Sequence, residues 1–181
     1  MSGWQRVAGA ALVVGLILAA PAVAQRNSSV SEEDLPLIKA AMIYNICKFV
    51  TWPEDPADDD FVLGLVGVGD GGPDFKIVAG KPIHEHPLTI IEVTSPADLR
   101  RCRVVFVADA QHLGELHASA RKLSLLTIGD DPGFAAGGGI VELVYDESRL
   151  RFIVNQAAAR GHGLELSSQL LKIAKKVMNL D

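Results

Sequence analysis

The stretch VVFVADAQHLGELHASARKLSLLTI, residues 104–128, decides the fold class of this chain. It opens with an apolar run of strand length at residues 104–107 and closes with another at 125–128, and residues 112–122 between them have a helical pattern. Parallel strands need a crossover connection, which is usually an α-helix. The stretch therefore predicts a βαβ unit in a mostly parallel sheet.

Similar apolar runs extend this pattern in both directions. Short helical stretches at 75–78 and 97–100 separate the earlier runs, whereas Asp146-Glu147-Ser148 is too short for a crossover and favours a hairpin turn. We therefore expect a single α/β domain with about six strands, an antiparallel C-terminal hairpin and helices on both faces of the sheet. The further predicted strands are residues 61–68, 88–93, 140–145 and 152–154.

Two helices flank the predicted sheet. The first is expected to have Ser31 as its N-cap and to run to Phe49. Apolar groups lie on nearly all of its sides, so we expect the sheet to cover one side and another element to cover a second. Ser167 or Ser168 is expected to cap a closing helix over residues 170–178.

The first 24 residues have the pattern of an export leader. A cationic start ends at Arg6, an apolar run covers residues 7–20, and small residues precede Gln25. We expect cleavage near Ala24, a mature domain over residues 25–181 of ordinary single-domain size, and a periplasmic location.

Charge and cysteine content narrow the possible functions. The formal net charge is −5 and the sequence shows no basic stripe, which argues against a nucleic-acid ligand. The only two cysteines, Cys47 and Cys102, are either a disulfide pair suited to an oxidising compartment or two buried thiols. The sequence leaves both interpretations open.

Little in the sequence predicts catalysis. No serine or cysteine stands in a nucleophile motif, and the G-x-G-x-x-G pattern at residues 67–72 places the Asp70 carboxylate where a pyrophosphate would sit. We therefore expect a protein that is not an enzyme and has no cofactor. His84 and His86 would point the same way in an extended segment and could serve an envelope metalloenzyme if a third ligand came from elsewhere. The simpler interpretation is a loop that faces solvent.

Several separated blocks together resemble one family. The resemblance spans nearly the whole chain beyond the leader, and it identifies the chain as similar to the YfiR-like periplasmic regulators. The blocks are Lys39-Ala40-Ala41, Tyr44-Asn45, KFVTWP at 48–53, TIGD at 127–130, PGFA at 132–135, RFIVN at 151–155 and LELSSQLL at 164–171.

The resemblance implies a function. Such a protein is a periplasmic repressor, often dimeric, that binds the periplasmic domain of an inner-membrane diguanylate cyclase and lowers cyclic di-GMP, with effects on biofilm. An outer-membrane lipoprotein can sequester it. Some relatives are also under redox control through cysteines, but this chain has Gly64 at the corresponding position of its first strand and matches only at Cys102.

We place the predicted binding surface where the first helix ends and the last helix begins. Several candidates also have a purely structural interpretation. Trp52 is suited to a position in the hydrophobic core, and Asn155 and Ser167 are suited to the N-caps of helices. Lys48 and Arg151 are suited to the solvated surface. A small-molecule sensor with an aromatic or amino-acid ligand beside Trp52 is the second hypothesis. The candidates are Lys48, Thr51, Trp52, Arg151, Asn155, Ser167 and Ser168.

Overall fold

The predicted βαβ unit is present at the centre of the molecule. In the computed structural model, β5 (Val104–Val107) and β6 (Leu126–Gly129) are parallel neighbours joined by α3 (Gln111–Lys122). The structure describes residues 33–53, 60–69, 72–109, 111–147 and 149–179. The predicted leader, its cleavage site and the predicted cap Ser31 lie outside these ranges.

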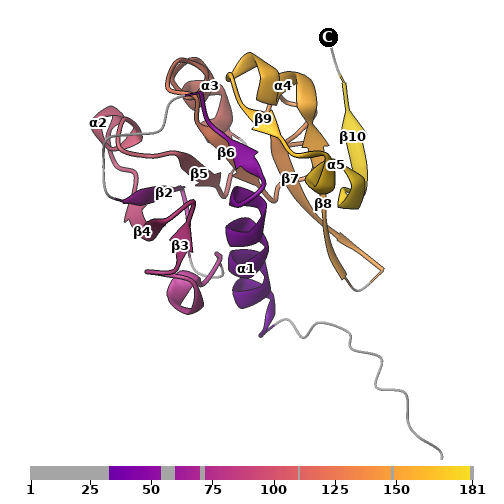
Figure 1. The fold of residues 1–181 in the computed structure, drawn as a ribbon, viewed down its shortest axis with the longest axis horizontal. Helices are drawn as coiled ribbons and strands as arrows, with labels where there is room; N and C mark the ends of the chain where they lie inside the picture. The colour runs from indigo at the N-terminus through magenta and orange to yellow at the C-terminus, as the bar shows by residue number, and fades with distance from the viewer. Residues whose placement is uncertain (1–32, 54–59, 70–71, 110, 148, 180–181) are drawn as a thin grey trace, which may run out of the picture.

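Strands on both sides of this unit extend it to an eight-stranded sheet (Figure 1). The five consecutive strands β4-β2-β5-β6-β7 are parallel, in the order of a flavodoxin-like doubly wound sheet. The predicted hairpin is confirmed, because β7 pairs with β8 in antiparallel fashion. The spatial order is β10 (Lys176–Met178), β8 (Arg149–Asn155), β7 (Val141–Asp146), β6, β5, β2 (Phe61–Val66), β4 (His86–Glu92) and β3 (Pro82–Ile83).

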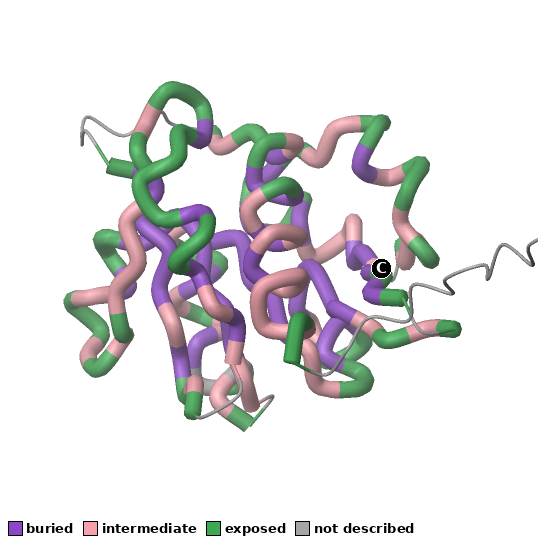
Figure 2. The backbone as a smooth tube through the Cα atoms, turned by 90° about the horizontal axis from the view of Figure 1, so that it is seen from below, coloured by how far each residue is buried: buried purple, intermediate pink, exposed green. Residues whose placement is uncertain are grey.

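Side chains of the central strands alternate between two hydrophobic clusters, one on each face of the sheet. In β5, Val104 and Phe106 join one cluster, whereas Val105 and Val107 join the other. Helix α1 (Leu35–Cys47), α4 (Gln156–Gly161) and α5 (Ser168–Ile173) cover the first face, and α2 (Pro96–Leu99) and α3 cover the second. Figure 2 shows these strands as the buried centre of the molecule.

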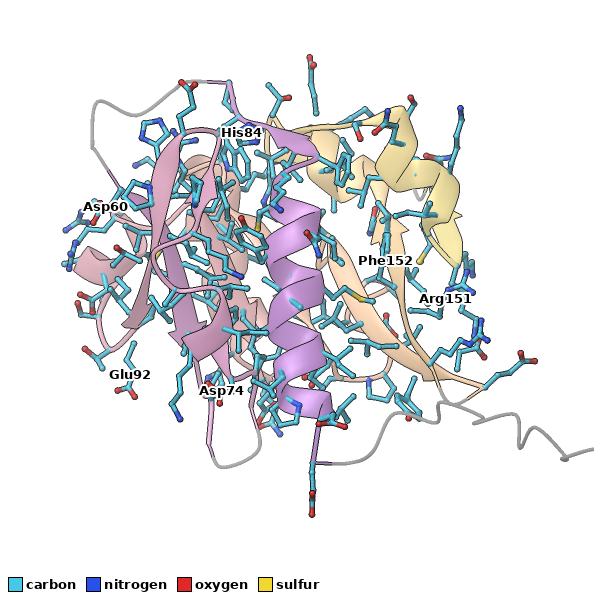
Figure 3. The ribbon with its side chains drawn as sticks, turned by 60° about the horizontal axis from the view of Figure 1, so that its bottom comes forward. Asp60, Asp74, His84, Glu92, Arg151 and Phe152 are labelled. Carbon is cyan, nitrogen blue, oxygen red and sulfur yellow. The ribbon has the colours of Figure 1, made fainter. Side chains whose placement is uncertain are left out.

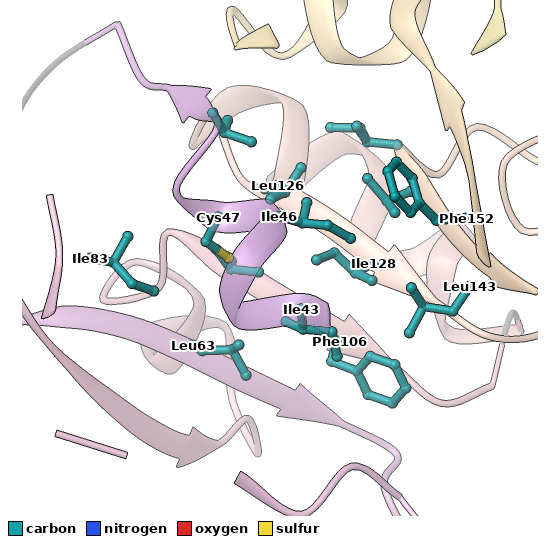
Figure 4. Close-up of a cluster of buried hydrophobic side chains, with 14 of the residues drawn as sticks. Ile43, Ile46, Cys47, Leu63, Ile83, Phe106, Leu126, Ile128, Leu143 and Phe152 are labelled. Atoms are coloured by element: carbon teal, nitrogen blue, oxygen red, sulfur yellow. The ribbon is translucent and has the colours of Figure 1, made fainter. Parts of the chain in front are cut away.

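Helix α1 provides the main cover of the first face (Figure 4). Ile43, Ile46 and Cys47 are fully or almost fully buried against the sheet. On its other sides, Met42 and Tyr44 are only partly buried, and the Tyr44 hydroxyl donates to the Pro82 carbonyl at 3.0 Å. No helix in the described part of the chain is long and apolar enough to span a bilayer.

The first and the closing helix both have ends that differ from those predicted from the sequence. Helix α1 has Asp34 at its N-cap and ends at Cys47, two residues before the predicted end. The closing helix α5 ends at Ile173, and Lys176–Met178 form strand β10, which pairs parallel to β8. The helical pattern of this segment is overridden because the open edge of β8 offers backbone partners, such as the Phe152 carbonyl that accepts from the Lys175 amide at 2.8 Å.

The two cysteines are free and far from forming a bridge. Cys47 belongs to the cluster beneath α1, whereas Cys102 belongs to the cluster on the opposite face. The disulfide considered from the sequence is therefore absent, because the sheet separates the two thiols. Burial raises the pKa of Cys47 and, together with the nearby Asp98 carboxylate, raises the pKa of Cys102 to about 11.

Gly64 of β2 faces Cys102. A methyl group at Gly64 would lie 2.7 Å from the Cys102 Sγ and 2.6 Å from the Val93 Cγ2. The position where some relatives have a cysteine therefore lies next to the Cys102 thiol in this fold.

Candidate functional site

The end of α1 and the beginning of α5 meet in a small two-stranded ribbon. Strand β1 (Val50–Thr51) pairs antiparallel with β9 (Glu165–Leu166), so that Thr51 lies opposite Glu165 (Figure 1). The Ser167 amide then donates to the Phe49 carbonyl at 2.9 Å. The fold thus brings together two segments that are far apart in the sequence.

Four exposed side chains define what we call the corner: Lys48, Thr51, Glu165 and Ser168. The Lys48 ammonium lies 3.9 Å from the centroid of the Tyr44 ring and donates to the Asn45 Oδ1 at 3.1 Å. The corner therefore presents a cation, a carboxylate and two hydroxyls, which is a polar surface suited to a protein partner.

Trp52 lies beside the corner but is held by the body of the protein. Its Nε1 donates to the Arg103 carbonyl at 3.3 Å, and its ring packs edge-on against Phe61 with centroids 5.3 Å apart. The His84 ring is a second edge-on neighbour at 6.2 Å. Trp52 is half-buried, so it shapes the surface as well as the core.

Besides Trp52, three of the predicted candidates do not form part of the corner surface. Asn155 is buried and is the N-cap of α4, and Ser167 is the N-cap of α5. Arg151 is exposed on β8 opposite Val144, and Figure 3 shows it on the other side of α1 from His84.

The blocks of the family resemblance instead connect one another inside the fold. Lys39 of α1 forms an ion pair with Asp130, which follows β6. The Asn155 Nδ2 donates to the Ala135 carbonyl at 2.8 Å, and the buried Glu142 carboxylate accepts from the Ala135 amide at 3.0 Å. Several of these residues therefore hold the loop after β6 in place.

A second feature, which we call the basic pocket, is a pocket that Trp52 lines together with Arg100, Arg101, Arg103 and Lys122. It has a volume of about 410 Å³, and the residues that the structure describes in its lining include four cations and one carboxylate. The small-molecule hypothesis placed an aromatic or amino-acid ligand beside Trp52, and it did not include this basic lining. The sequence signal for this lining is the basic stretch Arg100-Arg101-Cys102-Arg103, which lines the same pocket as Lys122 in the folded protein.

The metalloenzyme hypothesis fails on local geometry. His84 and Glu85 have positive φ angles of 48° and 73° and form the turn between β3 and β4, so His84 and His86 are not alternate residues of one extended strand. The His84 Nε2 lies 3.1 Å from the Val50 carbonyl oxygen. The described residues contain no group of three or more potential metal ligands.

Another histidine pair was not predicted. His162, which is 3% exposed, has its Nδ1 2.8 Å from the Leu125 carbonyl oxygen, while no partner lies near its buried Nε2. The His117 ring lies edge-on to it, with centroids 6.0 Å apart. Burial lowers the pKa of His162, so this imidazole is neutral at pH 7.

A family model described as YfiR/HmsC-like matches residues 37–175, a range that includes every residue of the corner and of the described pocket lining. No curated protein matches the chain in sequence.

Two solved structures show a similar fold. A conserved domain protein from Vibrio cholerae O1 biovar El Tor is 14% identical, with a TM-score of 0.51 over 79% of this chain and 60% of that one. An ABC domain from Streptococcus pneumoniae in complex with L-Trp is 12% identical, with a TM-score of 0.53 over 77% of this chain and 60% of that one. The chain thus spans 60% of the length of each, and these identities establish the fold alone.

Proposed function

This chain belongs to the YfiR/HmsC-like family, and on that basis we propose that it is a periplasmic regulator that binds and represses the periplasmic domain of an inner-membrane diguanylate cyclase. The observation that carries the proposal is the family match over residues 37–175. The regulator acts by binding and performs no catalytic step.

Repression by binding needs only a difference in affinity. If the cyclase alternates between active and inactive forms, a regulator that prefers the inactive form shifts the balance between them. Moving a two-state equilibrium from 1:99 to 99:1 takes about 10⁴-fold preference, or about 5.5 kcal/mol. An interface of ordinary size can supply this difference without any reactive group.

We assign the docking surface to the corner. Its exposed Lys48, Thr51 and Ser168 come from two segments that the ribbon β1–β9 fixes in place. Helix α5 begins there and ends in Ile173, whose 60% exposure adds apolar area on the same helix. A fixed backbone with mixed polar and apolar groups is the usual composition of a regulatory interface.

A binding measurement tests this assignment. The purified mature chain should bind the purified periplasmic domain of a diguanylate cyclase encoded beside its gene, and deletion of the gene should raise cyclic di-GMP in cells. The double variant Lys48→Glu with Thr51→Arg should weaken binding by about tenfold or more, because it reverses one charge and adds bulk at the corner.

A matched control is Arg149→Glu, an equally exposed charge reversal at the distant β7–β8 hairpin, which should bind as the wild type does. If the control loses affinity and the corner variant retains it, the docking surface lies elsewhere. If wild-type protein neither binds the domain nor alters cyclic di-GMP, the regulatory proposal is wrong.

The family membership also leads us to propose a homodimer and a second, lipoprotein partner in the outer membrane. Light scattering of the mature protein should give twice the monomer mass. The purified lipoprotein should compete with the cyclase domain for the regulator, and cell fractionation should find the mature protein in the periplasm with its N-terminus near Gln25.

A further inference from the structure

The basic pocket lies at the amino ends of the central strands. Asp60 precedes β2, Arg103 precedes β5, and Ser124 precedes β6, and all three line the pocket. Ligands of doubly wound folds usually bind at the opposite, carboxyl ends of the strands, so the fold by itself does not suggest this site. The volume of about 410 Å³ is within the range of small-molecule pockets.

The charge of the pocket is opposite to that of the molecule. Among the described lining residues are four cations, Arg100, Arg101, Arg103 and Lys122, and one carboxylate, Asp60, in a chain whose formal net charge is −5. Cations gathered in one concave site repel each other, and the pocket walls focus their field. A bound anion would relieve this repulsion.

The floor of the pocket is a fixed guanidinium. Arg103 is only 9% exposed, and its Cζ lies 5.5 Å from the centroid of the Trp52 ring and 5.6 Å from that of Phe61. These cation–π contacts hold the side chain between two aromatic walls. A charge held away from bulk water interacts more strongly with a ligand than an exposed one does.

We propose that the basic pocket binds a small phosphorylated molecule through its phosphate groups. Guanidinium groups pair with phosphate oxygens through two parallel hydrogen bonds, and three of the four cations are arginines. A phosphate ester carries about −1.5 to −2 charges at pH 7, which suits the pocket better than the single charge of a carboxylate. This proposal is independent of the cyclase proposal.

The experiment uses the whole mature chain. Pyrophosphate is the probe, and unfolding temperature is followed against sodium chloride of equal ionic strength. About 10 mM pyrophosphate should raise the unfolding temperature, with a dissociation constant below about 1 mM by calorimetry.

Substitutions at the pocket rim test where the probe binds. The exposed Arg100→Ser and Arg101→Ser together should weaken binding about tenfold or more. The matched control is Lys172→Ser with Lys176→Ser, which removes the same charge from the exposed C-terminal elements and should leave binding unchanged. Lys122→Ser is a second rim variant, to be used if the arginine pair fails to fold.

Three results would overturn the proposal. The first is no stabilisation of the wild type by pyrophosphate beyond that of chloride. The second is equal loss of binding in the rim and control variants, which would indicate a general charge effect. The third is co-sedimentation with phosphatidylglycerol vesicles without any response to pyrophosphate, which would assign the cations to a lipid headgroup in place of a soluble ligand.

Discussion

Phe134 shows how single residues set the loop after β6. Its ring is almost completely buried, and it occupies the space that side chains at Gly129 and Gly139 would need. A methyl group at Gly139 would lie 2.2 Å from the Phe134 Cε1. The small residues here are thus required by packing around one aromatic ring, which lies in a block shared with the family.

A pair of glycine substitutions tests this packing. Gly139→Ala should lower the free energy of unfolding by about 1–3 kcal/mol or more, because the ring must move within a closed core. Gly114→Ala in α3 has no atom within 4 Å of the new methyl group and should raise stability by up to about 1 kcal/mol. Urea unfolding measures both, and a loss at Gly114 equal to that at Gly139 would contradict the packing argument.

His162 gives the stability of the protein a pH dependence. Its pKa is lowered in the folded state by burial, while the unfolded chain has the ordinary value of about 6.5. At lower pH the unfolded state therefore binds the proton more readily than the folded state. The stabilisation is complete above about pH 6.5 and is lost as the pH falls through the folded-state pKa.

Melting temperatures between pH 7.5 and 5 check this prediction. The wild type should lose stability over this interval, and His162→Gln should show a flatter profile whatever its absolute stability. His112→Gln is the control and should keep the wild-type slope. An unchanged slope in His162→Gln would assign the pH dependence to other groups.

At the scale of elements, the sequence predicts long segments well and short ones poorly. The six apolar runs all became strands, and Ser167 caps the last helix, because burial and capping are local signals. Strands β1, β3, β9 and β10 have two or three residues each, and they exist because of partners that lie elsewhere in the chain. Their pairing is a tertiary effect that periodicity does not encode.

The same distinction applies to the candidate site. The meeting of Lys48 and Thr51 with Ser168 was predicted, because the family blocks contain both segments. The basic pocket was not, because Lys122 comes from the end of α3 while the arginines follow α2. The His117–His162 contact likewise joins α3 to the end of α4, which sequence spacing cannot show.

Strand β10 provides an element-scale prediction. Truncation after Ala174 removes the pairing of Lys176–Met178 with Ile153, Val154 and Asn155, and it opens the edge of β8. The free energy of unfolding should fall by about 1–3 kcal/mol, and amide exchange in β8 should accelerate. Lys176→Ala changes only an exposed side chain and should leave both unchanged. If amide exchange in β8 of the truncated protein were as slow as in the wild type, β10 would contribute nothing to the stability of the sheet.

For the whole molecule, one sheet shared by two hydrophobic clusters implies cooperative unfolding. Strands β2 and β5 each contribute side chains to both clusters, so neither cluster can be lost without disturbing the other. The cleavage proposed near Ala24 would remove Trp4 and leave Trp52 as the only tryptophan of the mature protein. Its fluorescence reports the region between the corner and the basic pocket.

Denaturation followed by two probes tests this cooperativity. Trp52 fluorescence and far-UV circular dichroism of the mature protein should give coincident urea transitions. An earlier fluorescence transition would show that the region around Trp52 opens before the sheet does.

The contact between Gly64 and Cys102 also bears on how this family can diversify. Codons for glycine and cysteine can differ by a single nucleotide, and the side chain introduced at position 64 would meet a sulfur atom already in place. A covalent crosslink between β2 and the segment before β5 is therefore one mutational step away. The new side chain would also have to displace Val93, so such a bond would be gained together with the repacking of one neighbouring valine.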